Sequence, residues 1–287
     1  MARVPEDQLP RVSVLTTAFN AEPFIVAAVR SVLDQRGIEV EHVVVDDGSE
    51  DRTVEMVRAL EDARVRIVEA GRVGRGRALN LALETASHDF VAILDADDVA
   101  HPDRLAIEVR MLAARSDLAA VGSGQLLLVE DAEPVFDPIT EVPEARDVGG
   151  ELLYYNPLSH SSVLFRRTAL ERVGGYDARR HALYDWDLYF RLVSIGYQLA
   201  KIRSPLVGKR THVRQYFEGR RMVRYALECL RLQWAAVGRL RRTRLNAPLL
   251  FVLFLYRLMP RFFRLGVRGV VGGRARRRPH GPDPSRA

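Results

Sequence analysis

Apolar and polar positions follow two different periods over the first half of the chain. Short runs rich in Val, Ile and Leu are separated by segments whose apolar positions recur every three to four residues. These patterns predict strands at residues 12–17, 40–46, 65–68, 90–94 and 119–129, with helices at 23–35, 51–60, 75–86 and 102–114. Nearly continuous apolar strands joined by helices are typical of a parallel sheet covered on both faces. We therefore predict an α/β fold, whose ligands bind beyond the carboxyl ends of the strands.

The pattern changes after the strand predicted at 119–129. Residues 130–151 are rich in Pro, Asp and Glu, which predicts a crossing loop or lid rather than a domain linker. Shorter elements follow, with strands expected at 161–165 and 198–202 and helices at 168–173 and 184–195. We expect these elements to complete the same domain.

Composition and charge divide the chain into two parts. Its 287 residues suffice for one large domain with an appendage, and the single cysteine excludes an internal disulfide framework. Residues 1–206 carry a net charge of −11 and residues 207–287 one of +17, within the overall +6. The basic end is therefore expected to seek anionic surfaces. The first residues lack signal-peptide character, so we expect folding to begin in the cytosol.

Two carboxylates one residue apart follow the apolar run at 90–94. In the segment Asp95, Ala96 and Asp97, the acidic side chains emerge where a buried strand ends. Hard oxygen ligands at such a point suit Mg²⁺ or Mn²⁺. A loop that caps the helix starting near Pro102 is the structural alternative, because acidic pairs after strands are common.

Two further polar segments end neighbouring predicted strands. In the first, Asp47 is followed by Gly48, which permits a left-handed turn, and by Ser49, which is expected to cap the next helix. A carboxylate there is placed to accept hydrogen bonds from a nucleobase or ribose. In the second, Phe19 offers a stacking face and Asn20 is expected to cap the helix near residue 23. Plain strand-to-helix turns remain the alternative for both segments.

Taken together, these segments resemble the GT-A glycosyltransferases, and among them the large inverting family 2, which uses nucleotide-diphosphate sugars. The resemblance extends from Val12 to about Arg210. It rests on six segments in the family's order: VSVLTTAFNAEPFI at 12–25, VVVDDGSEDRT at 43–53, GRGRALNLAL at 74–83, VAILDADD at 91–98, HSSVLFRRTALERVGGYD at 160–177 and YDWDLYFRL at 184–192.

The resemblance implies a site for the nucleotide-sugar donor. Asp95 would hold the ribose or help to order a metal, and Asp97 would ligate the Mn²⁺ or Mg²⁺ that bridges the diphosphate. His212 is similar to a family segment that closes over the diphosphate, as a third metal ligand or phosphate contact, and a surface histidine is the alternative. The remaining donor-binding residues expected are Thr17, Phe19, Glu22, Asp47, Arg77 and Ala96.

Arg75 and Arg77 open the helix predicted at 75–86. Their guanidinium groups, together with the amides of the helix terminus, are placed to support the phosphates of the donor. A solvated helix face explains the two arginines equally well.

The resemblance also implies a catalytic base. Asp185 matches the carboxylate that deprotonates the acceptor hydroxyl, which allows attack from the face opposite the leaving nucleotide. Tyr184 stands where the family usually has Glu, and this departure puts the orientation of the base and the acceptor preference in doubt. Asp187 is the rival base, although it points about 200° away around the helix. Stabilisation of a helix N-terminus is the alternative role for both carboxylates. His160 is expected to form a hydrogen bond in the acceptor-side core.

The basic C-terminal part contains two apolar patterns. Val223, Leu227, Leu230, Trp234 and Val237 form a helical seam, expected to pack on the catalytic domain or on a second copy of the chain. At 246–271, arginines at 257, 261, 264 and 268 run beside Leu and Phe, with Pro260 as a kink. This pattern predicts a helix in a membrane interface, and its ten-residue apolar stretch is too short to span a bilayer. Docking on the protein is the alternative.

The sequence therefore predicts a GT-A catalytic domain at 1–215, with a donor half at about 10–130 and an acceptor half at about 131–215. Residues 216–287 would form a helical extension that ends in a disordered basic tail at 272–287. The expected activity is metal-dependent transfer of a sugar to a glycan or lipid-linked acceptor at the cytosolic membrane surface. A homodimer through the C-terminal helices is considered, and no nucleic-acid partner is expected. The alternatives are a silent sugar-nucleotide-binding or scaffold protein and a sugar-phosphate nucleotidyltransferase, which requires a Gly-rich, Arg-bearing loop that TTAFNAEPF lacks.

Overall fold

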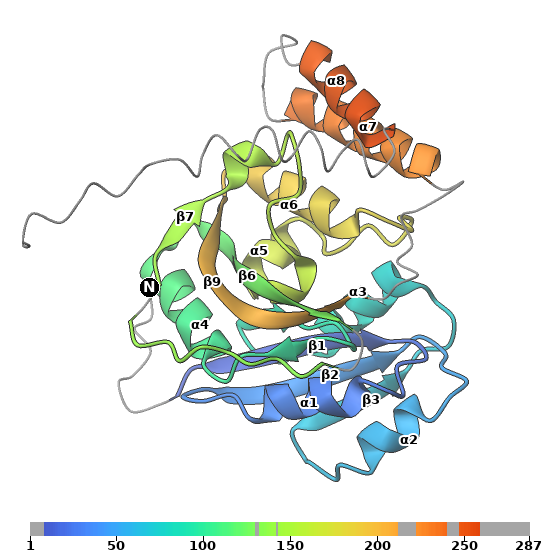
Figure 1. Ribbon diagram of the computed structural model, residues 1–287, viewed down its shortest axis with the longest axis vertical. Coiled ribbons are helices and arrows are strands. Elements are labelled where there is room, and N and C mark those ends of the chain that lie inside the picture. The colour runs from blue at the N-terminus through green and yellow to red at the C-terminus, as the bar shows by residue number, and fades with distance from the viewer. Residues whose placement is uncertain (1–8, 130–131, 142, 212–221, 240–246, 259–287) are drawn as a thin grey trace, which may run out of the picture.

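One mixed sheet forms the centre of the molecule. The computed structural model describes residues 9–129, 132–141, 143–211, 222–239 and 247–258. The strands lie in the order β3-β2-β1-β4-β8-β6-β9-β5, and β7 pairs with β9 (Figure 1). Their bounds are β1 Arg11–Ala18, β2 Glu39–Asp46, β3 Val65–Glu69, β4 Phe90–Ile93, β5 Val99–Ala100, β6 Leu118–Val129, β7 Ala145–Asp147, β8 Val163–Arg166 and β9 Gln198–Thr211.

Helices cover both faces of this sheet. Their bounds are α1 Ile25–Leu33, α2 Thr53–Arg58, α3 Arg75–Thr85, α4 Arg104–Ala114, α5 Arg167–Arg172, α6 Tyr184–Ser194, α7 Met222–Arg239 and α8 Ala247–Leu258, with 3₁₀ turns at Gly149–Glu151 and His160–Ser162. Side chains alternate along β4: Val91 and Ile93 join the core under α3, α5 and α6, whereas Ala92 joins the core under α1 and α4. The predicted fold class is confirmed.

The predicted parallel arrangement is found for β1 to β4 and for the pair of β6 and β9, whereas β8 departs from it. Strands β1, β2, β3 and β4 are mutually parallel. Strand β8 enters between β4 and β6 and is antiparallel to both. Between β6 and β8 the chain forms β7, which is antiparallel to β9. Periodicity alone does not carry strand direction.

Strand β9 is much longer than the predicted 198–202. It continues to Thr211 beside β6, with irregular register around Gly124. A Cβ atom on Gly124 would lie 2.5 Å from the carbonyl oxygen of Arg203, so the close approach there requires glycine. The polar residues Arg203 and Ser204 interrupt the apolar pattern, which concealed this part of the strand.

The C-terminal helices pack on the sheet's α6 side, but not through the predicted seam. The buried face of α7 consists of Ala226, Cys229, Leu232, Gln233 and Ala236. Three seam residues, Val223, Leu227 and Trp234, are instead exposed. The expectation that these three residues pack on the catalytic domain is therefore wrong, because the opposite face of α7 is the buried one. None of the described helices is both long and apolar enough to cross a membrane.

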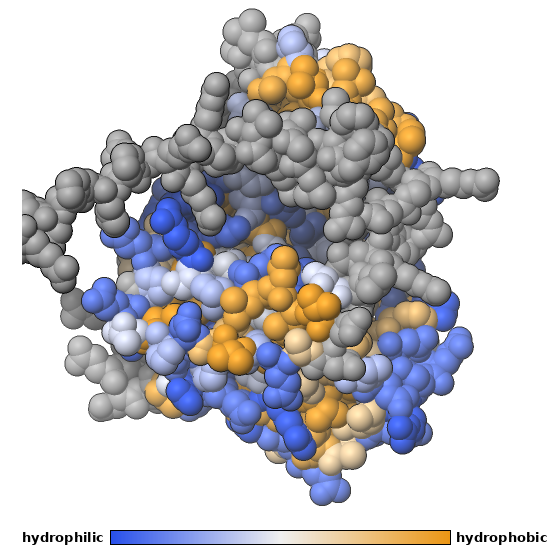
Figure 2. All heavy atoms as spheres, in the orientation of Figure 1, coloured by the Kyte–Doolittle hydropathy of each residue, from blue (hydrophilic) through white to orange (hydrophobic). Residues whose placement is uncertain are grey.

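Exposed apolar side chains gather on the solvent side of these two helices. We call them the hairpin outer face, and Figure 2 shows apolar atoms over α7 and α8. Its members are Val223, Leu227 and Trp234 of α7 and Leu249, Phe251, Val252 and Leu255 of α8. Of the predicted arginine stripe, Arg257 contacts the protein, and positions 261, 264 and 268 lie outside the described residues, as do Pro260 and the tail at 272–287.

Candidate active site

A pocket of about 330 Å³ lies at the carboxyl ends of β1, β2 and β4. This is where ligands bind in sheets of this kind. The predicted donor residues that line it are Thr17, Phe19, Asp47, Asp95, Ala96 and Asp97, together with Arg75. Two other predicted residues, Glu22 and Arg77, are not among its lining residues. Glu22 forms an ion pair with Arg52 at 2.6 Å, and Arg77 is exposed on α3. His212 lies outside the described residues.

Asp47 organises one wall of the pocket. Its Oδ1 accepts hydrogen bonds from the backbone N–H groups of Val73 at 2.8 Å and Gly74 at 2.9 Å. These bonds hold the loop before α3 against the end of β2. Gly48 has φ +83°, as its predicted left-handed turn requires, and an added Cβ would lie 3.1 Å from the backbone of the loop at residue 72. The turn therefore accepts only glycine without strain.

The predicted caps by Asn20 and Ser49 are wrong. Asn20 Oδ1 accepts the N–H of Glu50 at 2.9 Å, and Ser49 Oγ accepts the N–H of Asn20 at 2.9 Å. The two loops therefore bind each other across the pocket rim. At the start of α2, Asp51 Oδ1 accepts the N–H of Thr53 at 3.0 Å instead.

Three carboxylates meet at the end of β4. Asp95, Asp97 and Asp98 each offer an oxygen within 4.8 Å of the others. Asp98 is 1% exposed, and its Oδ2 has no hydrogen-bond partner among the described residues. Burial, together with the charge of Asp95, raises the pKa of Asp98 to about 7. A clustered set of hard oxygens that includes an unsatisfied buried atom fits a divalent cation.

Positive groups surround Asp95. Arg75 donates a hydrogen bond to its Oδ1, and the ammonium group of Lys209 lies 3.9 Å from its Oδ2. Burial by itself raises the pKa of Asp95, but Arg75 and Lys209 outweigh it and lower the pKa. Asp95 is therefore ionised and held in one orientation.

Arg210 connects this acidic segment with the end of β9. Its backbone N–H donates to Asp98 Oδ1 at 2.9 Å, and its Nε donates to the carbonyl of Asp97 at 3.1 Å. The guanidinium lies over the ring of Phe24, 4.7 Å from its centre. The geometry of the acidic segment thus depends on a strand more than one hundred residues away in sequence.

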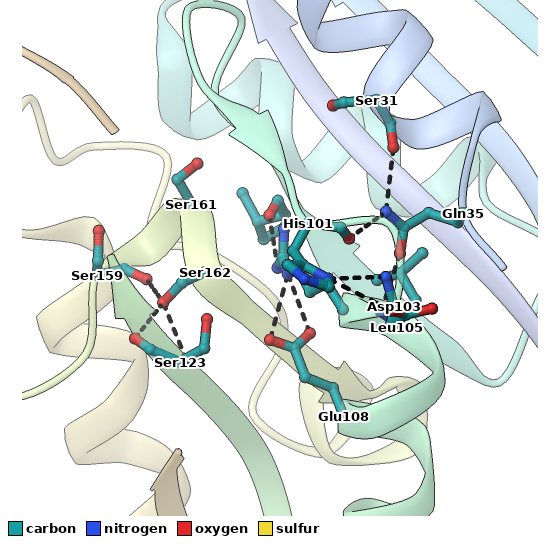
Figure 3. Close-up of polar contacts among 12 residues, drawn as sticks. Ser31, Gln35, His101, Asp103, Leu105, Glu108, Ser123, Ser159, Ser161 and Ser162 are labelled. Atoms are coloured by element: carbon teal, nitrogen blue, oxygen red, sulfur yellow. Dashed lines mark hydrogen bonds and ion pairs between the residues drawn. The ribbon is translucent and has the colours of Figure 1, made fainter. Parts of the chain in front are cut away.

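Buried polar side chains also contact the backbone of this segment and of β4, and Figure 3 shows Ser161 and Glu108 among them. Ser161 Oγ accepts the N–H of Asp95 at 3.0 Å, and Arg104 Nη2 donates to the carbonyl of Ile93 at 3.1 Å. Arg104 Nε lies 3.2 Å from both carboxylate oxygens of Glu108, and neither side chain is more than 1% exposed. Burial raises the pKa of Glu108 to about 7.

Asp185 lies in the first turn of α6, close to the pocket. Asn156 Nδ2 donates to its Oδ2 at 2.7 Å. Burial raises the pKa of Asp185. The guanidinium of Arg75 lies 5.4 Å from the centre of the neighbouring Tyr184 ring and also bonds Asp95, so one side chain joins the acidic segment to the start of α6.

The rival base Asp187 points elsewhere. It is 3% exposed and forms ion pairs with Arg191 at 2.8 Å and Arg180 at 3.1 Å. His160 Nε2 hydrogen-bonds the hydroxyl of Tyr176 at 2.9 Å, as expected for an acceptor-side core residue. Burial lowers the pKa of His160 to about 3, so its ring is neutral.

Comparison with known proteins agrees with this geometry. Residues 13–134 match the family described as "Glycosyl transferase family 2". This part of the chain is therefore similar to family 2 glycosyltransferases. The succinoglycan biosynthesis protein ExoO of Rhizobium meliloti is 41% identical over 114 residues, which are 39% of this chain and 32% of that protein. The putative teichuronic acid biosynthesis glycosyltransferase TuaG of Bacillus subtilis is 36% identical, over 47% of this chain and 54% of that protein. The chain therefore spans about a third to a half of these relatives.

Solved structures show the same GT-A fold over more of the chain. TarS of S. aureus in complex with UDP-GlcNAc has a TM-score of 0.65 at 19% identity, covering 86% of this chain and 72% of TarS. The mannosyltransferase PcManGT of Pyrobaculum calidifontis, in complex with GDP-Man and Mn²⁺, has a TM-score of 0.63 at 23% identity, covering 95% of this chain and 77% of that one.

Three residues of this site have structural roles that sequence reasoning missed. Asp98 was visible as the next residue after Asp97, but its burial was not. Asn156 follows an irregular segment that carries no motif. Arg210 was visible only as part of the segment near His212. A signal existed for Asp98 alone, namely a third carboxylate in the same run.

Proposed function

We propose that this chain is an inverting glycosyltransferase, which moves a sugar from a nucleotide-diphosphate sugar to a hydroxyl of a glycan or lipid-linked acceptor in cell-envelope or polysaccharide biosynthesis. The observation that carries the proposal is the position of Arg75, whose side chain contacts both Asp95 and the ring next to Asp185. The side chain of Arg75 thus lies between the donor pocket and the carboxylate base, and direct transfer requires the two to be close together. The names of the relatives from R. meliloti and B. subtilis support the biosynthetic context.

The acidic cluster holds Mn²⁺ or Mg²⁺ in this proposal. Asp97 is the favoured ligand, since it lines the donor pocket and offers an oxygen within 4.8 Å of Asp95 and Asp98. A bound cation would neutralise charge on the diphosphate as it leaves. The Mn²⁺ in the mannosyltransferase complex supports this choice of cation. Arg75 adds a fixed positive charge on the same side of the pocket.

Asp185 acts as the base. Its carboxylate accepts the proton of the acceptor hydroxyl while the hydroxyl oxygen attacks the anomeric carbon. The bond between that carbon and the diphosphate oxygen breaks, and the nucleoside diphosphate leaves with the electron pair. Attack opposite the leaving group inverts the anomeric centre. The raised pKa of Asp185 makes its carboxylate a stronger proton acceptor.

Donor binding is tested by thermal shift with UDP-glucose, UDP-GlcNAc and GDP-mannose, each with and without Mn²⁺. Asp97→Ala should abolish Mn²⁺-dependent stabilisation by the nucleotide sugar without changing the melting temperature of the unliganded protein. Asp89→Ala is the matched control, because Asp89 is exposed immediately before the opposite end of β4. Equal Mn²⁺-dependent stabilisation in both variants would contradict the assignment of Asp97.

Turnover is tested by release of nucleoside diphosphate from the donor that binds. Asp185→Asn should lower the rate by about 10²- to 10⁴-fold while donor binding is retained. Binding without turnover in the wild type would favour a silent sugar-nucleotide-binding or scaffold protein. Formation of a nucleotide sugar from a nucleoside triphosphate and a sugar phosphate would indicate a nucleotidyltransferase instead.

We also propose that the protein is a peripheral protein at the inner face of the cell membrane. The hairpin outer face supports this, because exposed Phe251, Val252 and Leu255 lie within residues 207–287, which carry a net charge of +17. The same charge disfavours a homodimer through these helices, since two such regions repel each other.

Sedimentation with vesicles containing anionic lipid tests this placement. The double substitution Phe251→Ser with Leu255→Ser should release the protein from the vesicles. Leu127→Ser is the control, because Leu127 is an exposed apolar residue on β6. Unchanged sedimentation of the double variant would refute the membrane contact, and loss of a dimer in its place would show that a second copy covers the face.

A further inference from the structure

We infer that Arg257 and Gln233, in the C-terminal helices, are positioning residues for the base Asp185. The inference rests on the proposed function, in which Asp185 is the base. It concerns residues far outside the segment that matches family 2, which ends at residue 134. We call Arg257, Gln233 and the backbone segment 152–154 the carbonyl clasp.

Side chains from three helices, α6, α7 and α8, donate hydrogen bonds to the three successive backbone carbonyl groups of this segment. Trp186 Nε1 donates to the carbonyl of Leu152 at 3.0 Å, and Gln233 Nε2 donates to that of Leu153 at 2.6 Å. Arg257 Nη2 donates to the carbonyl of Tyr154 at 3.1 Å. The segment 152–154 forms a turn in which the N–H of Tyr154 donates to the carbonyl of Glu151 at 2.9 Å, and the three donors satisfy carbonyl groups that have no strand partner.

Arg257 and Gln233 also fix each other. Arg257 Nη1 donates to Gln233 Oε1 at 2.7 Å, and Gln233 is fully buried. The guanidinium of Arg257 lies 5.6 Å from the centre of the Trp186 ring, next to Asp185 in sequence. A charged group that donates at low exposure makes stronger hydrogen bonds than a neutral one. Arg257 therefore joins α8 both to the segment and to the helix that carries the base.

The clasp reaches Asp185 through Asn156. Asn156 stands two residues after the last clasped carbonyl, and its Nδ2 donates to Asp185 Oδ2 at 2.7 Å. A shift of segment 152–154 would move Asn156 and rotate the carboxylate away from the acceptor hydroxyl. Misplacement of about 1 Å at a reacting group can lower a rate by about 10²-fold.

The hydrogen bond from Asn156 lowers the pKa of Asp185, although burial has the larger effect and raises it. Loss of the clasp should loosen this bond and move the acid limb of the pH–rate profile to higher pH. The other titratable groups that interact with Asp185 are Arg75 of α3, Tyr176 before α6, Tyr184 and Tyr189 of α6, and Tyr225 and Cys229 of α7. The clasp variants leave all of these side chains in place.

The test compares Arg257→Met with Arg231→Met in the full-length chain. Arg231 is an exposed arginine on α7, which makes it a matched control. Hydrolysis of UDP-glucose, UDP-GlcNAc and GDP-mannose is measured with Mn²⁺, together with the affinity for UDP and GDP. Arg257→Met should lower kcat by about tenfold or more, shift the acid limb upwards and leave nucleotide affinity within about twofold.

A double-mutant cycle with Asn156→Ala separates positioning from general stability. If Arg257 acts through Asn156, then Arg257→Met should have little further effect on kcat in the Asn156→Ala background. Additive losses, or a pH profile equal to that of Arg231→Met, would overturn the inference. A parallel fall in nucleotide affinity would also overturn it, because it would indicate a general loss of structure.

Hydrogen exchange gives a readout that needs no turnover. In Arg257→Met, the amides of residues 153–156 and 158 should exchange faster than in the wild type and in Arg231→Met, while those of β1 and β4 stay unchanged. Equal exchange in the two variants would refute the clasp. Absence of turnover by the wild type would refute the proposed function and leave this exchange result to decide the clasp.

Discussion

The buried pair of Arg104 and Glu108 provides a quantitative prediction. Arg104→Met keeps a chain of similar length but removes the cation, and Glu108 is fully buried in the native protein. Breaking a buried pair from one side costs about 3–5 kcal/mol, because a charge is left without compensation. The variant also loses the hydrogen bond to the carbonyl of Ile93, at the end of β4. We expect the free energy of unfolding at pH 8.5, where Glu108 is ionised in the wild type, to fall by about this amount, and the melting temperature by about 10 °C.

The loss should depend on pH. The pKa of Glu108 rises from 4.5 to about 7 on folding, so its protonated form favours the folded state below pH 4.5, and this advantage disappears between pH 4.5 and 7. The interaction with Arg104 lowers this pKa, so its removal extends the loss to higher pH. The difference between wild type and Arg104→Met should therefore be small at pH 5.5 and largest at pH 8.5.

Urea denaturation at pH 5.5, 7.0 and 8.5 measures the effect. The double variant Arg104→Met with Glu108→Leu should recover most of the lost stability, because an apolar pair of similar volume replaces the ion pair without a desolvation cost. A loss below about 1 kcal/mol at pH 8.5 would refute the reasoning. So would a double variant as unstable as the single one.

Three further predictions follow from single positions. Gly48→Ala should lower stability by about 1–2 kcal/mol, seen as a lower melting temperature, since φ is +83° there; an unchanged melting temperature would contradict this. Tyr184→Phe should keep the pH–rate profile, because the ring next to the Arg75 guanidinium remains. Tyr184→Glu should instead raise the pKa of Asp185 and so move the acid limb of the profile to higher pH. Identical profiles for the two variants would refute the role of the ring. Burial raises the pKa of the Cys229 thiol, so a disulfide reagent should label it slowly at pH 8 and rapidly in urea, and rapid native labelling would count against the packing of α7.

Element positions along the first half of the chain could be predicted well from periodicity. The helix predicted at 75–86 is α3 at Arg75–Thr85, and the strand predicted at 119–129 is β6 at Leu118–Val129. Both elements are buried along one or both faces, so their apolar residues recur at the period of a helix or a strand over the whole element. The pattern failed for β9, where Arg203 and Ser204 lie in a bulged strand that glycine at 124 permits.

The polar residues at the strand ends that line the pocket could likewise be predicted from the sequence. Asp47, Asp95 and Asp97 line one pocket because parallel neighbouring strands bring their carboxyl ends together, which the alternation of strands and helices implies. The caps expected from Asn20 and Ser49 were wrong because both side chains found partners in the opposite loop, about thirty residues away.

The sequence by itself therefore determined the fold class, the edge of the sheet that carries the pocket and the carboxylates that line it, because these follow from local periods and from residue chemistry. Only the tertiary structure decided the direction of β8, the burial of Asp98 and the partners of Asp185. The sequence placed Arg257 in a stripe expected to contact lipid, whereas in the structure Arg257 donates a hydrogen bond to the carbonyl of Tyr154. The reason is physical: an arginine at helical spacing has the same pattern whether it faces lipid, solvent or a carbonyl group, and only packing between distant segments selects among them.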